Sequence, residues 1–221
     1  MAKNKPVYAF EEADSKKRML LGGKGAGLSE MTRLKLPVPP GFTITTEVCN
    51  KYYDNNGKLP KDVMPAVMKN IAKMEKKTGK KWNSTKNPLL VSVRSGAAIS
   101  MPGMMDTILN LGLNEKTVEG FAEQTKNPRF SWDSYRRFIQ LFGKVVFGVN
   151  DEKFDHVLDD AKEKQGVTDD SKLSVESLKS IVSKYKKICE EHTKRKFPDT
   201  PNEQLVLSIE AVFKSWMGER A

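Results

Sequence analysis

Residues 91–107 read Val91-Ser-Val-Arg-Ser-Gly-Ala-Ala-Ile-Ser-Met-Pro-Gly-Met-Met-Asp-Thr107 and constrain the fold strongly. The β-favouring residues at the start of this stretch predict a strand that begins after Pro88. One arginine, Arg94, stands where this strand ends, and a turn of small residues follows it. A cation beside such a turn is a common setting for an anion site. The alternative is a strand with a surface arginine, followed by a methionine-rich turn that fills a gap in the core.

A second stretch with anion-binding character is Gly22-Gly-Lys-Gly-Ala-Gly27. We expect a loop here, followed by a helix that begins at Leu28. Glycines let backbone N–H groups approach an anion closely, and Lys24 adds a positive charge. The stretch is not a P-loop, because Gly25 follows the lysine, and it is not a dinucleotide fingerprint, because position 30 is Glu30. A phosphate cradle and a tight strand-to-helix turn both fit this pattern.

The net charge of the chain is +10 and it is unevenly distributed. Residues 1–112 contain 19 Lys and Arg against 9 Asp and Glu, whereas residues 113–221 contain 19 of each kind. The first half therefore carries a positive field that attracts phosphates, nucleotides or nucleic acid. The alternative is that most of these lysines decorate solvated helix faces.

The composition is that of a globular protein, with 30% charged and 38% apolar residues in 221 positions. No apolar run approaches the roughly 20 residues that span a bilayer, so we expect no membrane partner. Two cysteines and two histidines suggest neither a disulfide framework nor a zinc site. The N-terminus lacks the apolar core of a secretory signal, and we expect a cytoplasmic protein. An organelle address beyond residue 221 stays an alternative.

The first half of the chain mixes strand and helix patterns. We expect strands near residues 7–10, 42–45, 89–93 and 108–111, and helices near residues 28–34, 46–54 and 62–77. From Asn114 onwards the pattern is helical, with one helix capped by Ser131, one near residues 153–164, one capped by Ser174 and one from Pro201.

These patterns predict an α/β (α+β) fold. We expect an α/β lobe formed by residues 1–112 and 200–221, with a helical insert subdomain at residues 113–199. The chain stops five residues after Trp216, close to an apolar helix, so we expect it to be cut from a longer protein.

Five segments together resemble one known family, the pyruvate, phosphate dikinases. Leu20–Met31, Leu36–Thr46 and Val91–Thr107 resemble its N-terminal part in order and spacing. Asp133–Gly143 and Ala211–Trp216 fit the same family, so the resemblance extends over nearly the whole chain.

The resemblance implies the first half of an ATP-grasp-type nucleotide-binding domain in a phosphotransferase. Such an enzyme interconverts ATP, phosphate and pyruvate with AMP, diphosphate and phosphoenolpyruvate through a phosphohistidine. The family pattern implies a homodimer at full length, with further domains of the same polypeptide as partners. The Mg²⁺ ligands and the carrier histidine would lie beyond residue 221, because His156 and His192 do not match the carrier motif. We therefore expect no metal ligand and no complete catalytic site in this chain, and no turnover and weak nucleotide binding by the chain alone.

The resemblance assigns six residues to ATP binding: Lys24, Arg94, Gly103, Met105, Asp106 and Thr107. The first two match residues that hold the nucleotide phosphates, and the other four belong to a segment that lies over them. Ala98 stands where many family members have a second arginine, so we assign that position no phosphate role.

Two other functions compete with this interpretation. The related phosphoenolpyruvate synthases, which are water dikinases, use a similar nucleotide fold, although the loop Met101–Thr107 favours the pyruvate, phosphate dikinases. A basic module that binds RNA or another polyanion is the second alternative. The lysine-rich segments lack the interleaved aromatic residues that stack on bases, which disfavours it.

Overall fold

A computed structural model describes residues 4–96 and 107–216 of the chain. Both helices and short strands occur in these two ranges, which confirms the predicted mixed α/β character. None of the helices described there is long and apolar enough to cross a membrane.

The chain divides into two compact units. The N-terminal unit comprises the described residues of Met1–Lys80, Arg94–Asp106 and Val212–Ala221, and the helical unit comprises those of Lys81–Val93 and Thr107–Ala211. Strand β3 (Val91–Arg94) and helix α8 (Pro201–Ser215) each contribute residues to both units.

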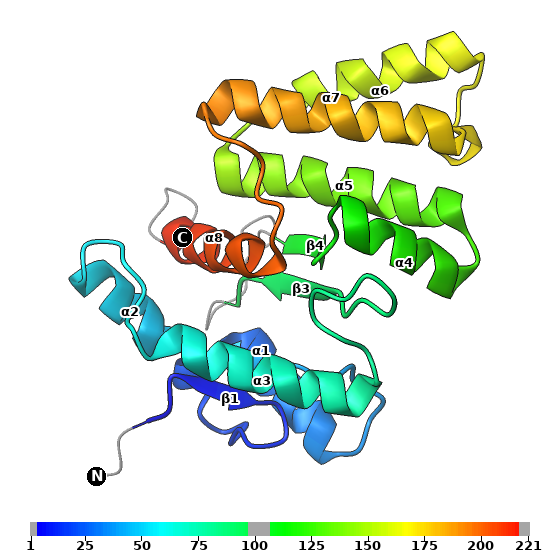
Figure 1. The fold of residues 1–221 in the computed structure, drawn as a ribbon. Coiled ribbons are helices and arrows are strands. Elements are labelled where there is room, and N and C mark those ends of the chain that lie inside the picture. The colour runs from blue at the N-terminus through cyan, green and yellow to red at the C-terminus, as the bar shows by residue number, and fades with distance from the viewer. Residues whose placement is uncertain (1–3, 97–106, 217–221) are drawn as a thin grey trace. The chain divides into compact units, whose positions relative to one another are not determined.

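The N-terminal unit contains a small antiparallel sheet and three helices, two of which contact the sheet while the third packs against one of these two (Figure 1). Its elements are β1 (Val7–Ala9), α1 (Arg18–Arg33), β2 (Phe42–Ile44), α2 (Thr46–Asp54) and α3 (Val63–Thr78). Val7 pairs with Ile44 in the β1–β2 register. The expected boundaries of α2 and α3 are confirmed, and α3 ends at Gly79 in the left-handed conformation that glycine favours.

Helix α1 begins earlier than the sequence predicts. We expected a glycine loop and a helix from Leu28, but the helical segment runs from Arg18 to Arg33 with a single break at Gly22. The residues after that break are helical despite their glycines. The side chain of Ser29 donates to the carbonyl of Gly25 (2.9 Å), and both residues are buried. Burial of this turn outweighs the low helix propensity of glycine, which is about 1 kcal/mol per residue.

The helical unit is organised around α5, which contacts α4, α7 and β4 (Figure 1). Its elements are β3, β4 (Thr107–Leu111), α4 (Glu115–Thr125), α5 (Pro128–Phe147), α6 (Glu152–Gln165), a short 3₁₀ helix (Asp170–Lys172), α7 (Val175–Thr193) and α8. One stripe of α5 provides the large apolar core residues Tyr135, Phe138, Ile139 and Phe142, all fully buried. This arrangement agrees with the helical pattern expected from Asn114 onwards.

One of the two predicted helix caps in this unit is confirmed and the other is wrong. Ser174 caps α7 by accepting a hydrogen bond from the backbone N–H of Ser177 (3.1 Å). Helix α5, however, begins at Pro128 and is capped by Asn127, whereas Ser131 lies inside the helix. Proline is well suited to the first helical position because it needs no backbone donor there, and the prediction had overlooked this signal.

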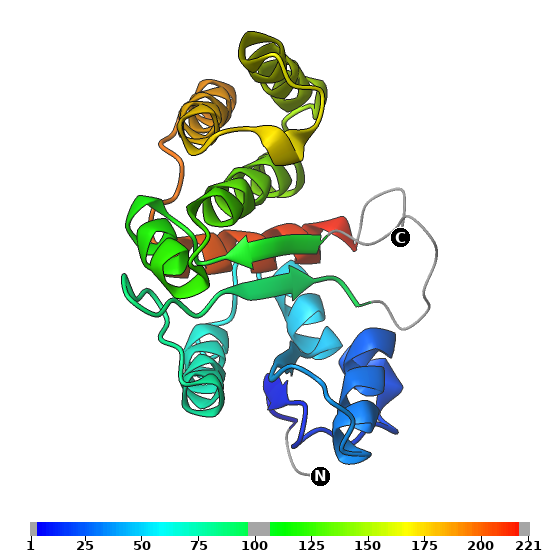
Figure 2. The ribbon, with the colours of Figure 1, turned by 90° about the vertical axis from the view of Figure 1, so that its right-hand side faces the viewer.

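The short β3–β4 sheet is anchored to the start of α8. Figure 2 shows the two strands side by side and running in opposite directions, with α8 along β4. The buried amide of Gln204 accepts from the N–H of Gly112 (3.1 Å) and donates to the carbonyl of Leu113 (3.0 Å). These bonds satisfy the backbone where β4 ends, so the first turn of α8 has a fixed place in this unit.

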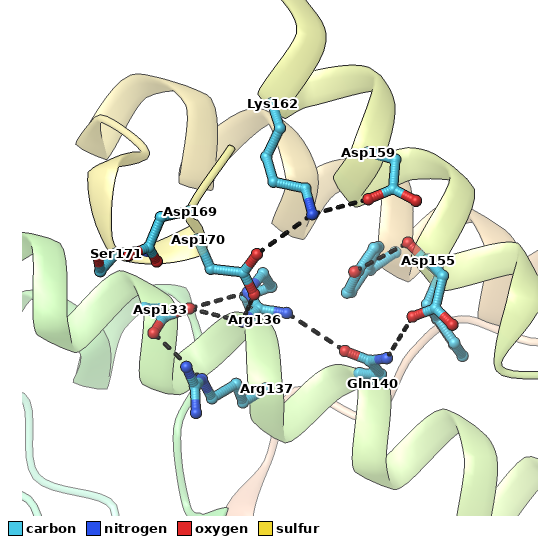
Figure 3. A network of polar contacts seen from close by, with 12 residues as sticks. Asp133, Arg136, Arg137, Gln140, Asp155, Asp159, Lys162, Asp169, Asp170 and Ser171 are labelled. Atoms are coloured by element: carbon cyan, nitrogen blue, oxygen red, sulfur yellow. Dashed lines mark hydrogen bonds and ion pairs between the residues drawn. The ribbon is translucent and has the colours of Figure 1, made fainter. Parts of the chain in front are cut away.

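A network of charged side chains connects α5, α6 and the 3₁₀ helix, as Figure 3 shows. Arg136, whose side chain is 3% exposed, donates twice to Asp133 (2.9 and 2.8 Å). It also lies 3.6 Å from Asp170, which in turn pairs with Lys162 of α6 (3.5 Å). Because the guanidinium group is buried, its charge depends on these carboxylates.

We predict that Asp133→Asn destabilises the helical unit by about 3 kcal/mol, because it leaves a buried arginine without its main counter-charge. Urea unfolding followed by circular dichroism measures the loss. The matched control is Glu191→Gln, which breaks the exposed Lys187–Glu191 pair and should cost less than about 0.5 kcal/mol. Equal effects of the two substitutions would contradict this account of the network.

Candidate functional site

The backbones of two segments of the N-terminal unit touch at Gly22 and Gly96. Gly22 has φ 71° and ψ 164°, a conformation that is nearly restricted to glycine. A methyl group placed on its Cα would lie 2.1 Å from the carbonyl oxygen of Gly96. The contact therefore requires a residue without a side chain at position 22, and it fixes the start of the helical segment of α1 against the chain that follows β3.

The two cations predicted from the sequence lie on either side of this contact. Lys24 follows the break at Gly22 by two residues, in the first turn of the part of α1 after that break, and Arg94 is the last residue of β3. A side-chain carbon added at Gly96 would lie 3.6 Å from Cβ of Lys24, so the lysine stem runs beside the turn after β3.

Burial and like charge lower the pKa of Lys24. Partial burial is the larger cause, and the neighbouring positive charge of Arg94 is the second. Both effects favour the neutral amine. Among residues 4–96 and 107–216, no carboxylate forms an ion pair with either Lys24 or Arg94. Two neighbouring cations, one just after a break in a helix and one at a strand end, form no ion pair with a carboxylate of the described residues and so make a site that an anion can occupy.

The structure thus brings together two of the six predicted ATP-binding residues, Lys24 and Arg94. Thr107 is the first residue of β4 and belongs to the helical unit. Three others lie outside the described residues: Gly103, Met105 and Asp106.

The two histidines lie on helix surfaces, as expected. His156 on α6 and His192 on α7 are both exposed. Within the described ranges, no three or more His, Cys, Asp or Glu residues are grouped so as to hold a metal ion.

Sequence reasoning missed the residues that support the turn after β3. The indole N–H of Trp216 donates to the hydroxyl of Ser95 (3.1 Å), the residue between Arg94 and Gly96. The two partners are 121 positions apart, so no local pattern links them. The run of small residues after Arg94 predicted a turn beside an anion site, but nothing in it indicated a contact with Trp216.

Comparison with known proteins now supplies the family. The sequence model described as "Pyruvate phosphate dikinase, AMP/ATP-binding domain" matches residues 18–63 and 55–221. The chain belongs to this family. The match confirms the predicted family.

Three curated relatives show the extent of the similarity. The chain is 54% identical to pyruvate, phosphate dikinase of Entamoeba histolytica over 215 residues, which are 97% of this chain and 24% of that protein. It is 49% identical to the enzyme of the same name from Clostridium symbiosum (97% and 25%). It is 46% identical to the chloroplastic pyruvate, phosphate dikinase 1 of Arabidopsis thaliana (98% and 23%). The chain spans about a quarter of the length of these relatives.

We predict that Gly22→Ala destabilises the N-terminal unit by about 3 kcal/mol or more, because it adds both backbone strain and a clash with Gly96. Chemical denaturation measures the effect. Gly27→Ala in the same helix is the matched control, since its new methyl group meets nothing within 4 Å. The control should stabilise the unit by about 0.5–1 kcal/mol. A tolerated Gly22→Ala would contradict the close approach.

We also predict that Lys24→Met makes the N-terminal unit more stable at neutral pH. The pKa of Lys24 is lower in the folded chain than its usual 10.5, so the protonated form weakens the fold below that pKa. Removing the charge should gain up to about 1 kcal/mol at low salt, and less at high salt. Urea unfolding at pH 7 and above pH 10.5 tests this, because the gain from removing the charge should disappear once the lysine is neutral. A loss of stability at pH 7 would contradict the like-charge contact.

Proposed function

We propose that this chain is the ATP-binding portion of a pyruvate, phosphate dikinase and that Lys24 and Arg94 hold the phosphates of ATP. The observation that carries the proposal is the pair of adjacent cations, which has no carboxylate partner in the described residues of an AMP/ATP-binding domain. The lowered pKa of Lys24 supports it, because a bound polyphosphate would neutralise the repulsion between the two side chains.

The reaction proposed for the whole enzyme interconverts ATP, phosphate and pyruvate with AMP, diphosphate and phosphoenolpyruvate. Phosphoryl transfer depends mainly on positioning and on neutralising charge over the transferred group. In this proposal Lys24 contributes a compact charge, whereas the planar guanidinium of Arg94 donates two parallel hydrogen bonds to phosphate oxygens. The backbone contact at Gly22 and Gly96 holds the two groups in place before the substrate arrives.

The described residues do not fit a magnesium ion. Mg²⁺ prefers carboxylate and other oxygen ligands, whereas the candidate site presents two cations. As the family resemblance implies, we place the Mg²⁺ ligands, like the carrier histidine, outside this chain and derive no step through the metal.

We propose an ATP-grasp-type domain in which residues 1–112 and 200–221 form the nucleotide-binding lobe and residues 113–199 form the helical insert. Gly103, Met105, Asp106 and Thr107 would complete the phosphate site. The full enzyme would be a cytoplasmic homodimer.

We predict that Lys24→Ala and Arg94→Ala each weaken ATP binding to the chain by about 10- to 100-fold, because one charged hydrogen bond to phosphate contributes about 1.5–3 kcal/mol. Titration of ATP into isotope-labelled protein, followed by NMR, detects even millimolar dissociation constants. Lys69→Ala is the matched control, since it removes one exposed charge from α3 of the same unit. It should change the affinity less than about twofold.

The outcome also separates the competing functions. Unchanged ATP affinity in both variants would contradict the proposed phosphate clamp, by which we mean Lys24 and Arg94 together. Salt-sensitive binding of RNA that survives both substitutions, without competition from ATP, would favour the polyanion-binding module instead. In the full enzyme we expect the product to be diphosphate, whereas a water dikinase would release phosphate. Conversion of pyruvate by the 221-residue chain alone would contradict the proposal.

A further inference from the structure

We propose that Trp216 is a positioning residue for the phosphate clamp: its indole holds the turn after β3 so that Arg94 stays beside Lys24. This inference rests on the proposed function of Lys24 and Arg94, and it assigns a role to a residue outside that pair. All the residues involved belong to the N-terminal unit.

The first observation is the bond between Trp216 and Ser95. Ser95 is 3% exposed and directly follows Arg94, and its hydroxyl accepts from the indole N–H of Trp216 (3.1 Å). Gly96 follows at once and makes the close contact with Gly22. The peptide that leaves Arg94 is thus fixed at two consecutive residues, once by a side chain and once by the backbone.

The second observation is that contacts with α2 hold the end of α8, so the backbone that leads to the indole is itself fixed in place. Phe213 is buried, and its ring lies 5.5 Å from that of Tyr52 on α2. The hydroxyl of Tyr53 donates to the carbonyl of Phe213. Three residues later the chain reaches Trp216, and the backbone N–H of Trp216 donates to the same carbonyl (3.1 Å). Helix α2 therefore fixes the place from which the indole reaches Ser95.

The third observation is that α2 also supports the lysine side of the clamp. At its N-terminal end the hydroxyl of Thr46 donates to the carbonyl of Met19 (2.7 Å), three residues before the break at Gly22. One helix thus holds both segments, through Thr46 at one end and through Tyr52 and Tyr53 at the other. The backbone contact between Gly22 and Gly96 joins the same two segments directly.

Fixing the strand end at Arg94 should tighten phosphate binding, and it gives Trp216 no part in the reaction itself. An arginine on a mobile strand end must lose conformational entropy when it binds phosphate, and that loss weakens binding. A strand end that is already fixed spares part of this loss. It also keeps two like charges together, which would otherwise separate in the absence of an anion.

The test replaces the indole by a ring without the N–H donor. Trp216→Phe in the 221-residue chain should weaken binding of inorganic triphosphate by about three- to tenfold, the range that one neutral hydrogen bond supports. Trp82→Phe is the matched control, because Trp82 also donates its indole N–H, to Asn202 (2.7 Å), but in the helical unit. The control should leave triphosphate affinity unchanged.

A double-mutant cycle distinguishes positioning from a general loss of stability. If Trp216 acts through Arg94, the effect of Trp216→Phe on affinity should disappear in the Arg94→Ala background. A full effect in that background would overturn the inference. A direct readout is the Trp216 indole N–H signal in the ¹H–¹⁵N spectrum of the three tryptophans, which should shift on addition of triphosphate while that of Trp82 does not.

The outcomes also separate this inference from the proposed function. Loss of binding in Lys24→Ala and Arg94→Ala but not in Trp216→Phe would overturn the positioning role alone. Wild-type chain that binds no triphosphate at millimolar concentration would overturn both the clamp and the role of Trp216.

Discussion

Two positive side chains, Lys24 and Arg94, stand beside each other because the backbones that carry them touch at Gly22 and Gly96. Like charges at short range repel, and partial burial of Lys24 strengthens the effect. The pair persists since Gly22 adopts a conformation that suits glycine and the turn after β3 is bonded to Trp216. The repulsion between the two cations thus lowers the stability of the fold slightly, and a bound polyphosphate would remove this repulsion. Functional sites commonly reduce the stability of their fold in this way.

The sequence singled out the two cations of the candidate site but not the geometry around them. Arg94 at the end of a strand and Lys24 among glycines were both recognisable, because each combines a charge with an unusual local composition. The start of α1 was predicted wrongly, since glycine propensity alone favours a loop. A methyl group on Gly25 would lie 2.7 Å from the hydroxyl oxygen of Thr43, so this glycine serves close packing and not flexibility. Only the folded chain reveals that distinction.

The contacts that the sequence did not predict join residues that are far apart in the chain. The bond from Trp216 to Ser95 and the bond from Tyr53 to Phe213 join positions 121 and 160 residues apart. The sequence predicted helices where α2 and α8 lie, but it could not pair them. In the helical unit the same holds for the buried Arg136 of α5, which lies 3.6 Å from Asp170 of the 3₁₀ helix. Buried polar contacts of this kind depend on which helices meet, and local pattern carries little of that information.

The most direct test of the account is the pKa of Lys24 measured by NMR of its side chain, with and without saturating inorganic triphosphate. The account predicts a pKa below the usual 10.5 in the free chain, because burial and Arg94 disfavour the charged amine. It predicts a rise of that pKa when triphosphate binds, because the anion stabilises the protonated form. A pKa of 10.5 that triphosphate leaves unchanged would contradict the central claim that these two cations form one anion site.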